Sequence, residues 1–401
     1  MMTTAGAGKI LYVGTLPPHN GGSAISCGQL ITEIARAGYL IAAISPATAA
    51  SLDGGDHFAA RHPELRIVRY LLPYFYLEPG TEELKRVEEC QVRTLFQESA
   101  ASFDPDLVIV GRESFAPYVP ELATAQGLPV VQWVRGSATS HYSYWKNTED
   151  GRTRVLGFRR ARVILTAAEH LTENLRRFGF DTAKTIPNAI DLDRFSPGPG
   201  SPELRAELGI DRNCSMILVP GNLIPRKRPF DVLEGAAKAL DEEGSLMFVV
   251  AGAGKMLAEV REACRRRGLA ERFRFPGWVD YERMPDFYRS ADLVIVASEL
   301  EGLARAYIEA MACERVLLCS RIPASQELVR DGVNGLFFRV GDADEMAEKI
   351  LMVVRDCQLR ARLGREARRS VQDRSIHVAV RRYLEEIKTV LQLRPVSKGQ
   401  S

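Results

Sequence analysis

The sequence predicts an α/β protein of two domains, each built on a parallel β-sheet covered by helices. Three observations lead to this prediction. Near-continuous Val/Ile/Leu runs alternate with longer amphipathic stretches, as expected for strands buried on both faces and joined by crossover helices. The 401 residues exceed the ~250–300 that one hydrophobic core usually serves. A Pro/Gly-rich segment near the middle separates two halves with the same alternation.

The apolar runs of the first half predict strands at residues 9–14, 39–45, 66–72, 106–111, 129–134 and 162–167. Those of the second half predict strands at 215–221, 246–252, 272–275, 292–298 and 315–320. Between them, "TIPNAIDLDRFSPGPGSPEL" is rich in proline and glycine and predicts a linker. We expect a first domain over 1–187, a second over 188–376, and a last helix at about 377–391 that returns to the first.

Ligands of open parallel sheets bind beyond the carboxyl ends of the strands. Two such domains that face each other would form a deep cleft between them. A cleft of that kind suits a two-part ligand or two substrates.

The composition excludes several classes of protein. A net charge of +2 is too balanced to predict a nucleic-acid partner. The seven cysteines are scattered without a CxxC pair, which favours a reducing compartment. The start, "MMTTAGAGKILYV", has no long apolar segment, and no run reaches the ~18 residues of a membrane span, so we expect a cytoplasmic protein. The basic and apolar stretch 152–165 leaves a peripheral membrane contact open, although a solvated helix face is the simpler explanation.

Several patterns resemble cofactor or metal sites but lack residues that such sites require. "GAGK" at 6–9 and 252–255 lacks the other residues of a phosphate loop, and "TLPPHNGG" after the first strand is not GxGxxG. Asp-x-Asp triplets begin at Asp104, Asp191 and Asp342, and we predict turn or capping roles for them. The six histidines show no ligand spacing, so we expect no metal and no cofactor.

Two acids stand eight residues apart in "VASELEGLARAYIEAMACERVLL" (296–318). Glu301 lies on the predicted turn before a helix "LARAYIEAMA", and the free amides of Gly302, Leu303 and Ala304 would form an anion site at the helix start. Eight helical residues span ~12 Å, which suits the length of a nucleotide sugar. Glu301 would then meet the sugar, and Glu309 would accept both ribose hydroxyls. Two exposed surface glutamates are the alternative.

This stretch resembles the donor-site signature of the retaining glycosyltransferases of family 4, through Glu301-Gly302 and Glu309-Ala310-Met311-Ala312. That family has the GT-B fold, in which two Rossmann-like domains face each other across a deep cleft. The resemblance covers nearly the whole chain. Further segments similar to the family are "TLPPHNGGSAISCGQLITEIARAGYLI", "TIPNAIDLDRFSP", "GNLIPRKRPFDVLEGAAKAL", "DGVNGLFF" and "LRARLGREARR".

The resemblance implies transfer of a sugar from a UDP- or GDP-linked donor to a hydroxyl acceptor, without metal. It also implies that the configuration is retained and that an alpha-glycosidic bond forms. The acceptor would be a sugar, a lipid-linked sugar or a small molecule, in glycan, glycolipid or natural-product biosynthesis. A non-catalytic protein that binds nucleotide sugars and a nucleotide-sugar epimerase remain alternatives.

The resemblance also assigns roles to residues. Glu301 would hold the transferred sugar, and Lys227 would neutralise the leaving diphosphate. The rest of the donor side would comprise Gly22, Asn222, Arg226, Gly302, Leu303, Ala304 and Glu309. The acceptor side would comprise Gly21, Glu113, Arg135, Gly136 and His141.

The chain departs from the family at several positions. Asn222 stands where Arg is common, and Arg226 or Arg228 could compensate. Arg135 stands where many relatives have His, and it cannot act as a general base, although it can bind a phosphate or carboxylate. This predicts an anionic donor sugar or acceptor, while pairing with a structural acid such as Glu113 is an equal alternative. The aromatic residues of 141–145 could line the acceptor site or belong to the core.

Overall fold

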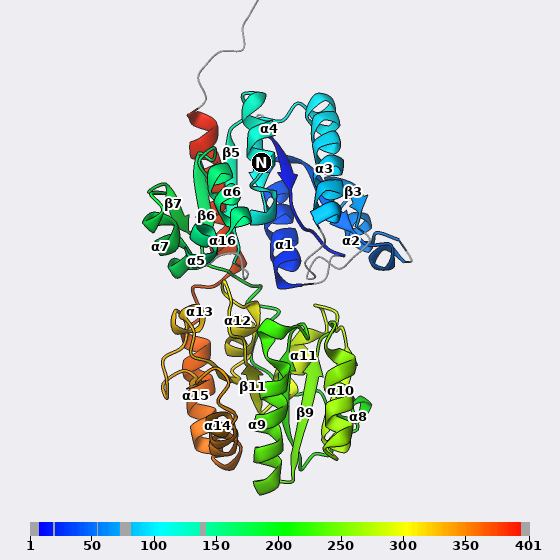
Figure 1. The fold of residues 1–401 in the computed structure, drawn as a ribbon. Coiled ribbons are helices and arrows are strands. Elements are labelled where there is room, and N and C mark those ends of the chain that lie inside the picture. Colours follow the sequence, from blue (N-terminus) through cyan, green and yellow to red (C-terminus); the bar gives the residue numbers. More distant parts are fainter. Residues whose placement is uncertain (1–7, 19–20, 54, 73–81, 137–141, 394–401) are drawn as a thin grey trace, which may run out of the picture. The chain divides into compact units, whose positions relative to one another are not determined.

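The computed structural model describes residues 8–18, 21–53, 55–72, 82–136 and 142–393 (Figure 1). The chain divides into two compact units, Met1–Pro187 together with His377–Ser401, and Asn188–Ile376. Each unit has a parallel sheet covered by helices, so the predicted α/β class is confirmed.

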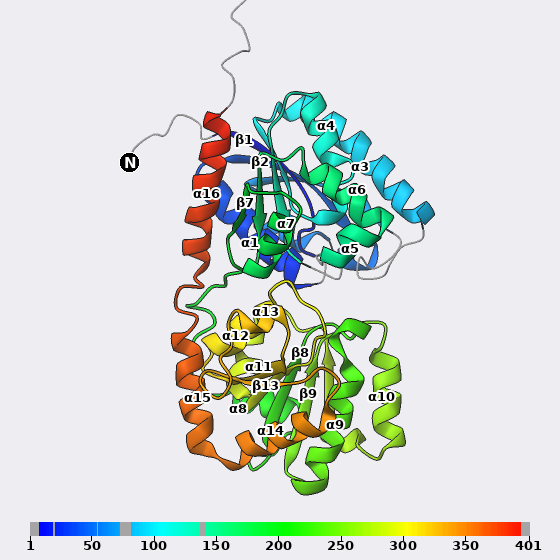
Figure 2. The same cartoon turned by 60° about the vertical axis from the view of Figure 1, so that its left-hand side comes forward.

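The described strands of the first unit form a seven-stranded parallel sheet in the order β3-β2-β1-β4-β5-β6-β7. Strand β1 pairs with β2 through Ile10 and Ile41, and with β4, the central strand, through Ile10 and Leu107. Figure 2 shows helices on both faces of this sheet, which explains why β4, β5 and β6 are buried at every position. The strands are β1 (Lys9–Val13), β2 (Leu40–Ala47), β3 (Leu65–Leu71), β4 (Leu107–Val110), β5 (Val130–Val134), β6 (Val163–Thr166) and β7 (Ala183–Thr185).

The helices of this unit join successive strands, except for the last, which returns after the second unit. They are α1 (Gly22–Arg36), α2 (His57–Arg61), α3 (Glu82–Phe103), α4 (Val119–Ala125), α5 (Tyr142–Asn147), α6 (Glu149–Phe158), α7 (Glu169–Arg177) and α16 (Ile376–Gln392), with short 3₁₀ helices η1 (Ala50–Leu52) and η2 (Glu113–Phe115).

Helix α16 packs on the first unit, far in sequence from the rest of it (Figures 1 and 2). The ring of Tyr383 lies 5.0 Å from that of Trp133 on β5, and Arg135 Nη1 donates to the Tyr383 hydroxyl at 3.1 Å. Lys184 and Glu386 form an ion pair at 2.8 Å. The helix therefore fills part of the core of the first unit.

The described strands of the second unit form a six-stranded parallel sheet in the order β10-β9-β8-β11-β12-β13. The strands are β8 (Ser215–Pro220), β9 (Leu246–Ala251), β10 (Phe273–Gly277), β11 (Leu293–Val296), β12 (Val316–Ser320) and β13 (Leu336–Phe338). The helices are α8 (Pro202–Glu207), α9 (Pro229–Glu242), α10 (Leu257–Arg266), α11 (Met284–Ser290), α12 (Arg305–Ala312), α13 (Pro323–Gln326), α14 (Ala343–Arg355) and α15 (Cys357–Arg369), with η4 (Pro225–Lys227) and η5 (Ala270–Arg272).

The predicted linker contains the boundary between the two units, at Pro187/Asn188, so its place is confirmed, although its later residues belong to the second unit. The residues after Asn188 pack on the second unit because buried and half-buried side chains bind their backbone. Arg289 Nε donates to the Ser196 carbonyl at 3.0 Å, and Arg315 Nη2 donates to the Gly198 carbonyl at 3.1 Å. Proline and glycine here mark a chain without regular structure, but one that is firmly held.

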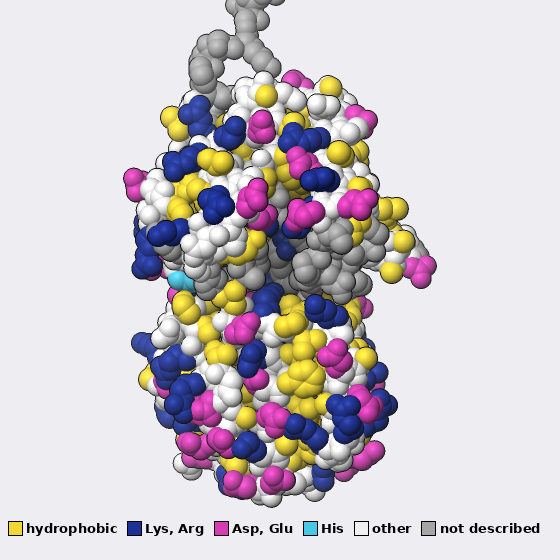
Figure 3. All heavy atoms as spheres, viewed as in Figure 1, with side chains coloured by type: hydrophobic (Ala, Val, Ile, Leu, Met, Phe, Trp, Pro, Cys, Tyr) yellow, Lys and Arg dark blue, Asp and Glu magenta, His cyan; other side chains and the backbone are white. Residues whose placement is uncertain are grey.

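The surface is mixed in charge. Figure 3 shows acidic and basic side chains interspersed on the visible face of each unit, as the small net charge suggests. All seven cysteines lie in the described residues, and all are free thiols. In the part of the chain that the structure describes, no helix combines the length and apolar character needed to cross a membrane.

Candidate functional site

A basic loop, residues 221–228, follows β8 in the second unit. The chain turns at Gly221, whose φ of 129° favours glycine. Pro225 then begins η4, since its fixed φ suits a first helical position. The loop presents Arg226 and Lys227 just beyond the carboxyl end of the sheet, where open α/β sheets bind their ligands.

Glu301 lies on a second loop, between β11 and α12, and contacts two of the three cations of the basic loop, Arg226 and Lys227. Lys227 Nζ lies 2.5 Å from Glu301 Oε1, and Arg226 Nη1 lies 3.3 Å from the same oxygen. Arg226 Nη1 also donates to the Leu300 carbonyl at 3.1 Å, and the Glu299 amide donates to the Arg226 carbonyl at 2.9 Å. Side chains and backbone together join the two loops.

The two cations stabilise the charge of Glu301, whereas burial and Arg226 oppose the charge of Lys227. Burial raises the pKa of the Glu301 carboxyl, but Lys227 and Arg226 outweigh burial, so the pKa lies below its ordinary value. Burial lowers the pKa of the Lys227 ammonium, and Glu301 only partly opposes this. With Lys227 protonated, two cations face one carboxylate, and the cluster carries a net positive charge. Such a cluster attracts a phosphate-bearing ligand.

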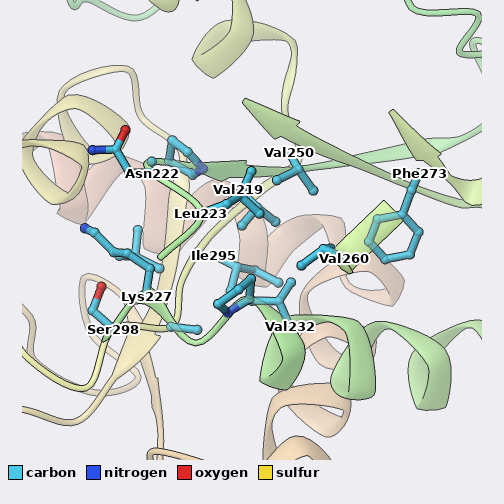
Figure 4. Close-up of a pocket in the computed structure, with 15 residues that line it drawn as sticks. Val219, Asn222, Leu223, Lys227, Val232, Val250, Val260, Phe273, Ile295 and Ser298 are labelled. Atoms are coloured by element: carbon cyan, nitrogen blue, oxygen red, sulfur yellow. The ribbon is translucent and has the colours of Figure 1, made fainter. Parts of the chain in front are cut away.

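A small cavity lies beneath the basic loop (Figure 4). Asn222, Lys227 and Ser298 stand at its polar end, and Val260 and Phe273 at its apolar end. Its volume of about 30 Å³ is close to that of one water molecule. Ligand pockets usually measure ~300–1,000 Å³. A nucleotide would therefore have to bind outside this cavity.

Glu309 lies on the buried face of α12, so the alternative of a surface glutamate is wrong for this residue. It is 7% exposed. The Tyr288 hydroxyl donates to Glu309 Oε2 at 2.9 Å, and Arg305 Nε donates to Glu309 Oε1 at 3.1 Å. Both oxygens of the carboxylate thus already have a donor from the protein.

The start of α12 corrects a prediction. The helix begins at Arg305, two residues later than predicted, because Ala304 is extended, with φ −65° and ψ 126°. Gly302, Leu303 and Ala304 therefore lie in the turn before the helix, and their amides are not helix-start amides as predicted. The Leu303 carbonyl accepts from Asn188 Nδ2 at 2.6 Å, which fixes this turn.

The glycine pair predicted on the acceptor and donor sides lies at the start of α1 in the first unit. Gly21 precedes the helix with φ 133°, a conformation that favours glycine, and Gly22 is the first helical residue. Two residues without side chains therefore begin this helix, and the approach of a substrate to their backbone stays a prediction.

Arg135 and its neighbours form a buried group in the first unit. Arg135 is 7% exposed and donates to Tyr383, while Glu113 Oε1 accepts from the Gly136 amide at 2.8 Å. The bond to Tyr383 gives Arg135 a structural contact, but Tyr383 is not an acid, so the predicted pairing with an acid such as Glu113 stays an alternative. Binding of an anionic ligand by Arg135 stays a prediction.

The predicted aromatic acceptor cluster divides between core and surface. Trp145 is fully buried, with its ring 5.8 Å from that of Phe158 and 5.7 Å from that of Phe178, so the core alternative is confirmed for it. The Tyr144 hydroxyl donates to Asp150 at 2.5 Å. His141 lies outside the described residues.

Turn and capping roles are confirmed for the Asp-x-Asp triplets that begin at Asp191 and Asp342, whereas Asp106 in the first triplet binds a residue 97 positions away. Asp106 accepts from the Lys9 amide at 2.9 Å. Asp191 Oδ1 accepts from two amides that follow it in a turn, and Asp342 Oδ1 caps α14 by accepting from the Glu345 amide at 2.9 Å. These carboxylates are therefore occupied by backbone donors.

The structure brings Lys227, Arg226 and Glu301 together and places Glu309 on the next helix of the same unit. The predicted acceptor-side residues belong to the other unit. Sequence analysis missed Arg305 and Tyr288, which donate to Glu309, and Tyr281, which accepts from Arg305. Only Arg305 left a signal, because it stands four residues before Glu309 on a predicted helix.

Known structures share the fold. The chain resembles the Anabaena HepE protein in complex with UDP and glucose, with a TM-score of 0.75, 18% identity, and coverage of 95% of this chain and 99% of that one. The chain also resembles sucrose-phosphate synthase from Thermosynechococcus elongatus, with a TM-score of 0.77 and 18% identity. That match covers 96% of this chain and 99% of the synthase chain. The similarity shows the GT-B fold of two Rossmann-like domains, and at this identity it shows the fold alone.

Curated relatives match a smaller part of the chain. D-inositol 3-phosphate glycosyltransferase 2 of Catenulispora acidiphila is 30% identical over 200 residues, 47% of this chain and 47% of that protein. The D-inositol 3-phosphate glycosyltransferase of Geodermatophilus obscurus is 28% identical over 219 residues, which are 51% of this chain and 48% of that protein. The chain thus spans about half the length of the curated relatives that it matches.

Family models cover most of both units. The family described as "Glycosyl transferase 4-like domain" matches residues 21–189. The family described as "Glycosyl transferases group 1" matches residues 200–370, which include the basic loop, Glu301 and Glu309. The chain belongs to the group 1 glycosyltransferases.

Proposed function

We propose that this protein is a retaining glycosyltransferase that moves a sugar from a UDP- or GDP-linked donor to a hydroxyl acceptor and forms an alpha-glycosidic bond. The observation that carries the proposal is the contact of Glu301 with Lys227 and Arg226, followed by the buried carboxylate of Glu309. Family membership supports sugar transfer. Structures of the Anabaena relative with UDP and UDP-glucose support a nucleotide sugar as the donor.

Each part of the donor meets a suitable group in this proposal. Lys227 and Arg226 bind the diphosphate and turn partly away from Glu301, which then accepts hydroxyls of the sugar. Gly302 has no Cβ and lets the donor approach the backbone. Glu309 accepts the two ribose hydroxyls, because its two oxygens match a vicinal diol.

The cations act in the chemical step. The bond between the sugar C1 and the phosphate oxygen breaks, and negative charge grows on the leaving diphosphate. Lys227 and Arg226 stabilise that charge in the transition state. The acceptor oxygen forms the new bond to C1 on the same face and gives its proton to the leaving phosphate oxygen. No metal or cofactor enters this scheme.

The acceptor is a sugar, a lipid-linked sugar or a small molecule, in glycan, polysaccharide, glycolipid or natural-product biosynthesis. A nucleotide-sugar epimerase and a non-catalytic binding protein are the other outcomes of an activity test. An epimerase would change the nucleotide sugar without any acceptor. A binding protein would bind nucleotide and leave the donor intact.

The proposal also places the protein in the cytoplasm, in peripheral contact with the inner face of the membrane. Helix α6 supports the contact, because Leu156 is 59% exposed beside the exposed Arg152, Arg159 and Arg160. We expect sedimentation with anionic phospholipid vesicles and less with neutral ones. Equal sedimentation with both, or a Leu156→Ser variant that binds as well as wild type, would reject this contact.

Thermal-shift measurements with UDP, GDP, ADP and TDP test the donor site first. One nucleotide should raise Tm above the others, since stabilisation grows as RT ln(1 + [L]/Kd). We expect the shift to survive EDTA, because Lys227 and Arg226 supply the positive charge.

Two variants accompany that measurement: the first tests the role of Glu309, and the second is its control. Glu309→Gln keeps the shape of the side chain and removes its charge, so the nucleotide-induced shift should largely disappear. Lys238→Ala removes an exposed cation that pairs with Asp344 on the same unit, and the shift should stay. No shift with any nucleotide would reject the proposed function.

A further inference from the structure

Three side chains, Arg305, Tyr281 and Tyr288, form a cage at Glu309 that the proposed function does not use. Arg305 and Tyr288 contact Glu309 directly, and Tyr281 contacts Arg305. Arg305 Nε and the Tyr288 hydroxyl each donate to one oxygen of Glu309, at 3.1 and 2.9 Å. Arg305 Nη2 donates to the Tyr281 hydroxyl at 2.8 Å, and the guanidinium carbon lies 5.0 Å from the centre of the Tyr281 ring. The Arg305 and Glu309 side chains are only 5% and 9% exposed.

Helix stability does not explain an arginine at position 305. Arg305 is the first residue of α12, next to the positive end of the helix dipole, where a cation is unfavourable. It also precedes its glutamate by four residues, the less favourable order for such a pair. Burying both charges costs desolvation energy that an ion pair seldom recovers in full. An apolar residue would suit the fold better.

The cage leaves Glu309 able to accept further hydrogen bonds. Burial and the charge of Glu309 raise the pKa of Tyr288 well above its ordinary value, so its hydroxyl stays protonated and donates. Burial lowers the pKa of Arg305, but Tyr281 and Glu309 outweigh burial, and the guanidinium stays charged. A carboxylate has about four acceptor sites. Each oxygen of Glu309 uses one acceptor site for Tyr288 or Arg305, so one acceptor site remains on each oxygen. Two such sites can accept from the two hydroxyls of a vicinal diol.

We propose that Arg305 is a positioning residue that fixes the carboxylate of Glu309 for the two ribose hydroxyls of the nucleotide. The inference rests on the proposed function, in which Glu309 binds the ribose. Arg305 acts through Glu309 and does not itself touch the ribose, while Tyr288 fixes the second oxygen. Removal of Arg305 should therefore abolish the preference for a ribose over a deoxyribose.

Isothermal titration of the full chain with UDP and 2′-deoxy-UDP, and with GDP and 2′-deoxy-GDP, tests this. In whichever of these two pairs binds, the wild-type protein should bind the ribonucleotide about 10- to 100-fold more tightly than the deoxynucleotide. This is the range expected for hydrogen bonds to a charged group. Arg305→Leu should reduce the preference to about twofold or less, since the carboxylate is no longer oriented. Arg305→Lys, which keeps a cation, should restore part of it.

Arg315→Leu is the matched control. Arg315 is a partly buried arginine of the same unit whose guanidinium donates to the Gly198 and Ala291 carbonyls. Its loss should lower Tm and leave the ribose preference as in wild type. If Arg305→Leu does not fold, Tyr288→Phe removes one donor to Glu309 and should still lower the preference severalfold.

Several results would overturn the inference. One is a wild-type ribose preference in Arg305→Leu, or in Tyr288→Phe where the former does not fold. Another is an equal loss in Arg315→Leu, which would show a general effect of destabilisation. Wild type that binds ribo- and deoxynucleotides equally would overturn the inference while nucleotide binding stands. Wild type that binds neither would remove the proposed function and the inference with it.

Discussion

Lys227→Ala should lower kcat/KM about 10²–10³-fold, as expected for loss of one group that stabilises charge in a transition state. Lys227 lies against Glu301 in the structure, and in the proposed function it binds the leaving diphosphate. Because that charge grows during the reaction, kcat should fall more than KM for the donor rises. Initial rates with the donor whose nucleotide stabilises the protein measure both constants.

Lys238→Ala is the control for Lys227→Ala. It removes the same side chain from an exposed site on α9, where Lys238 pairs with Asp344. Its rate should match wild type, since an exposed ion pair contributes at most ~1 kcal/mol to stability. If Lys227→Ala kept more than about a third of the activity while it remained folded, Lys227 would have no role in charge stabilisation.

Glu309→Leu should lower the free energy of unfolding by about 3–5 kcal/mol, the usual cost of removing one partner from a buried ion pair. The guanidinium of Arg305 would stay buried without this carboxylate. The double variant Arg305→Leu/Glu309→Leu should lose much less, because neither charge remains in the core. Urea unfolding of wild type, both single variants and the double variant gives the four values.

The outcome of that cycle distinguishes a coupled pair from two independent residues. If the losses of the single variants add up in the double variant, Arg305 and Glu309 do not stabilise each other and the cage has no energetic meaning. Asp344→Ala is the surface control. It breaks the exposed pair with Lys238, and we expect a change within about 1 kcal/mol.

The strands were the most predictable part of the fold, since burial on both faces leaves a local record in the sequence. Every predicted apolar run coincides with a strand, β1 to β6 and β8 to β12. Strands β7 and β13 escaped prediction because they have three residues each. The Ala-Lys-Thr of β7 also lies at a sheet edge and lacks an apolar run. A strand of three residues is recognised by its pairing with the adjacent strand, which the local sequence does not show.

The candidate site was predictable only in part. The resemblance to a known family pointed to Glu301, Lys227 and Glu309, and the structure brings the first two together. The contacts of Glu309 with Tyr288 and of Arg305 with Tyr281 join residues 21 and 24 positions apart, on elements whose packing no local pattern reveals. Arg135 and Tyr383 are 248 positions apart, so their hydrogen bond follows only from the complete fold.

The place of α16 has a consequence for how this chain is made. A ribosome delivers the whole of the second unit before it delivers Tyr383, whose site against Trp133 is in the first unit. During that interval the first unit exposes apolar surface that the finished protein covers with Tyr383, Ile387 and Val390. Nascent domains tend to fold in order from the N-terminus. Here we expect the first unit to begin folding first and to complete its core only after translation reaches α16.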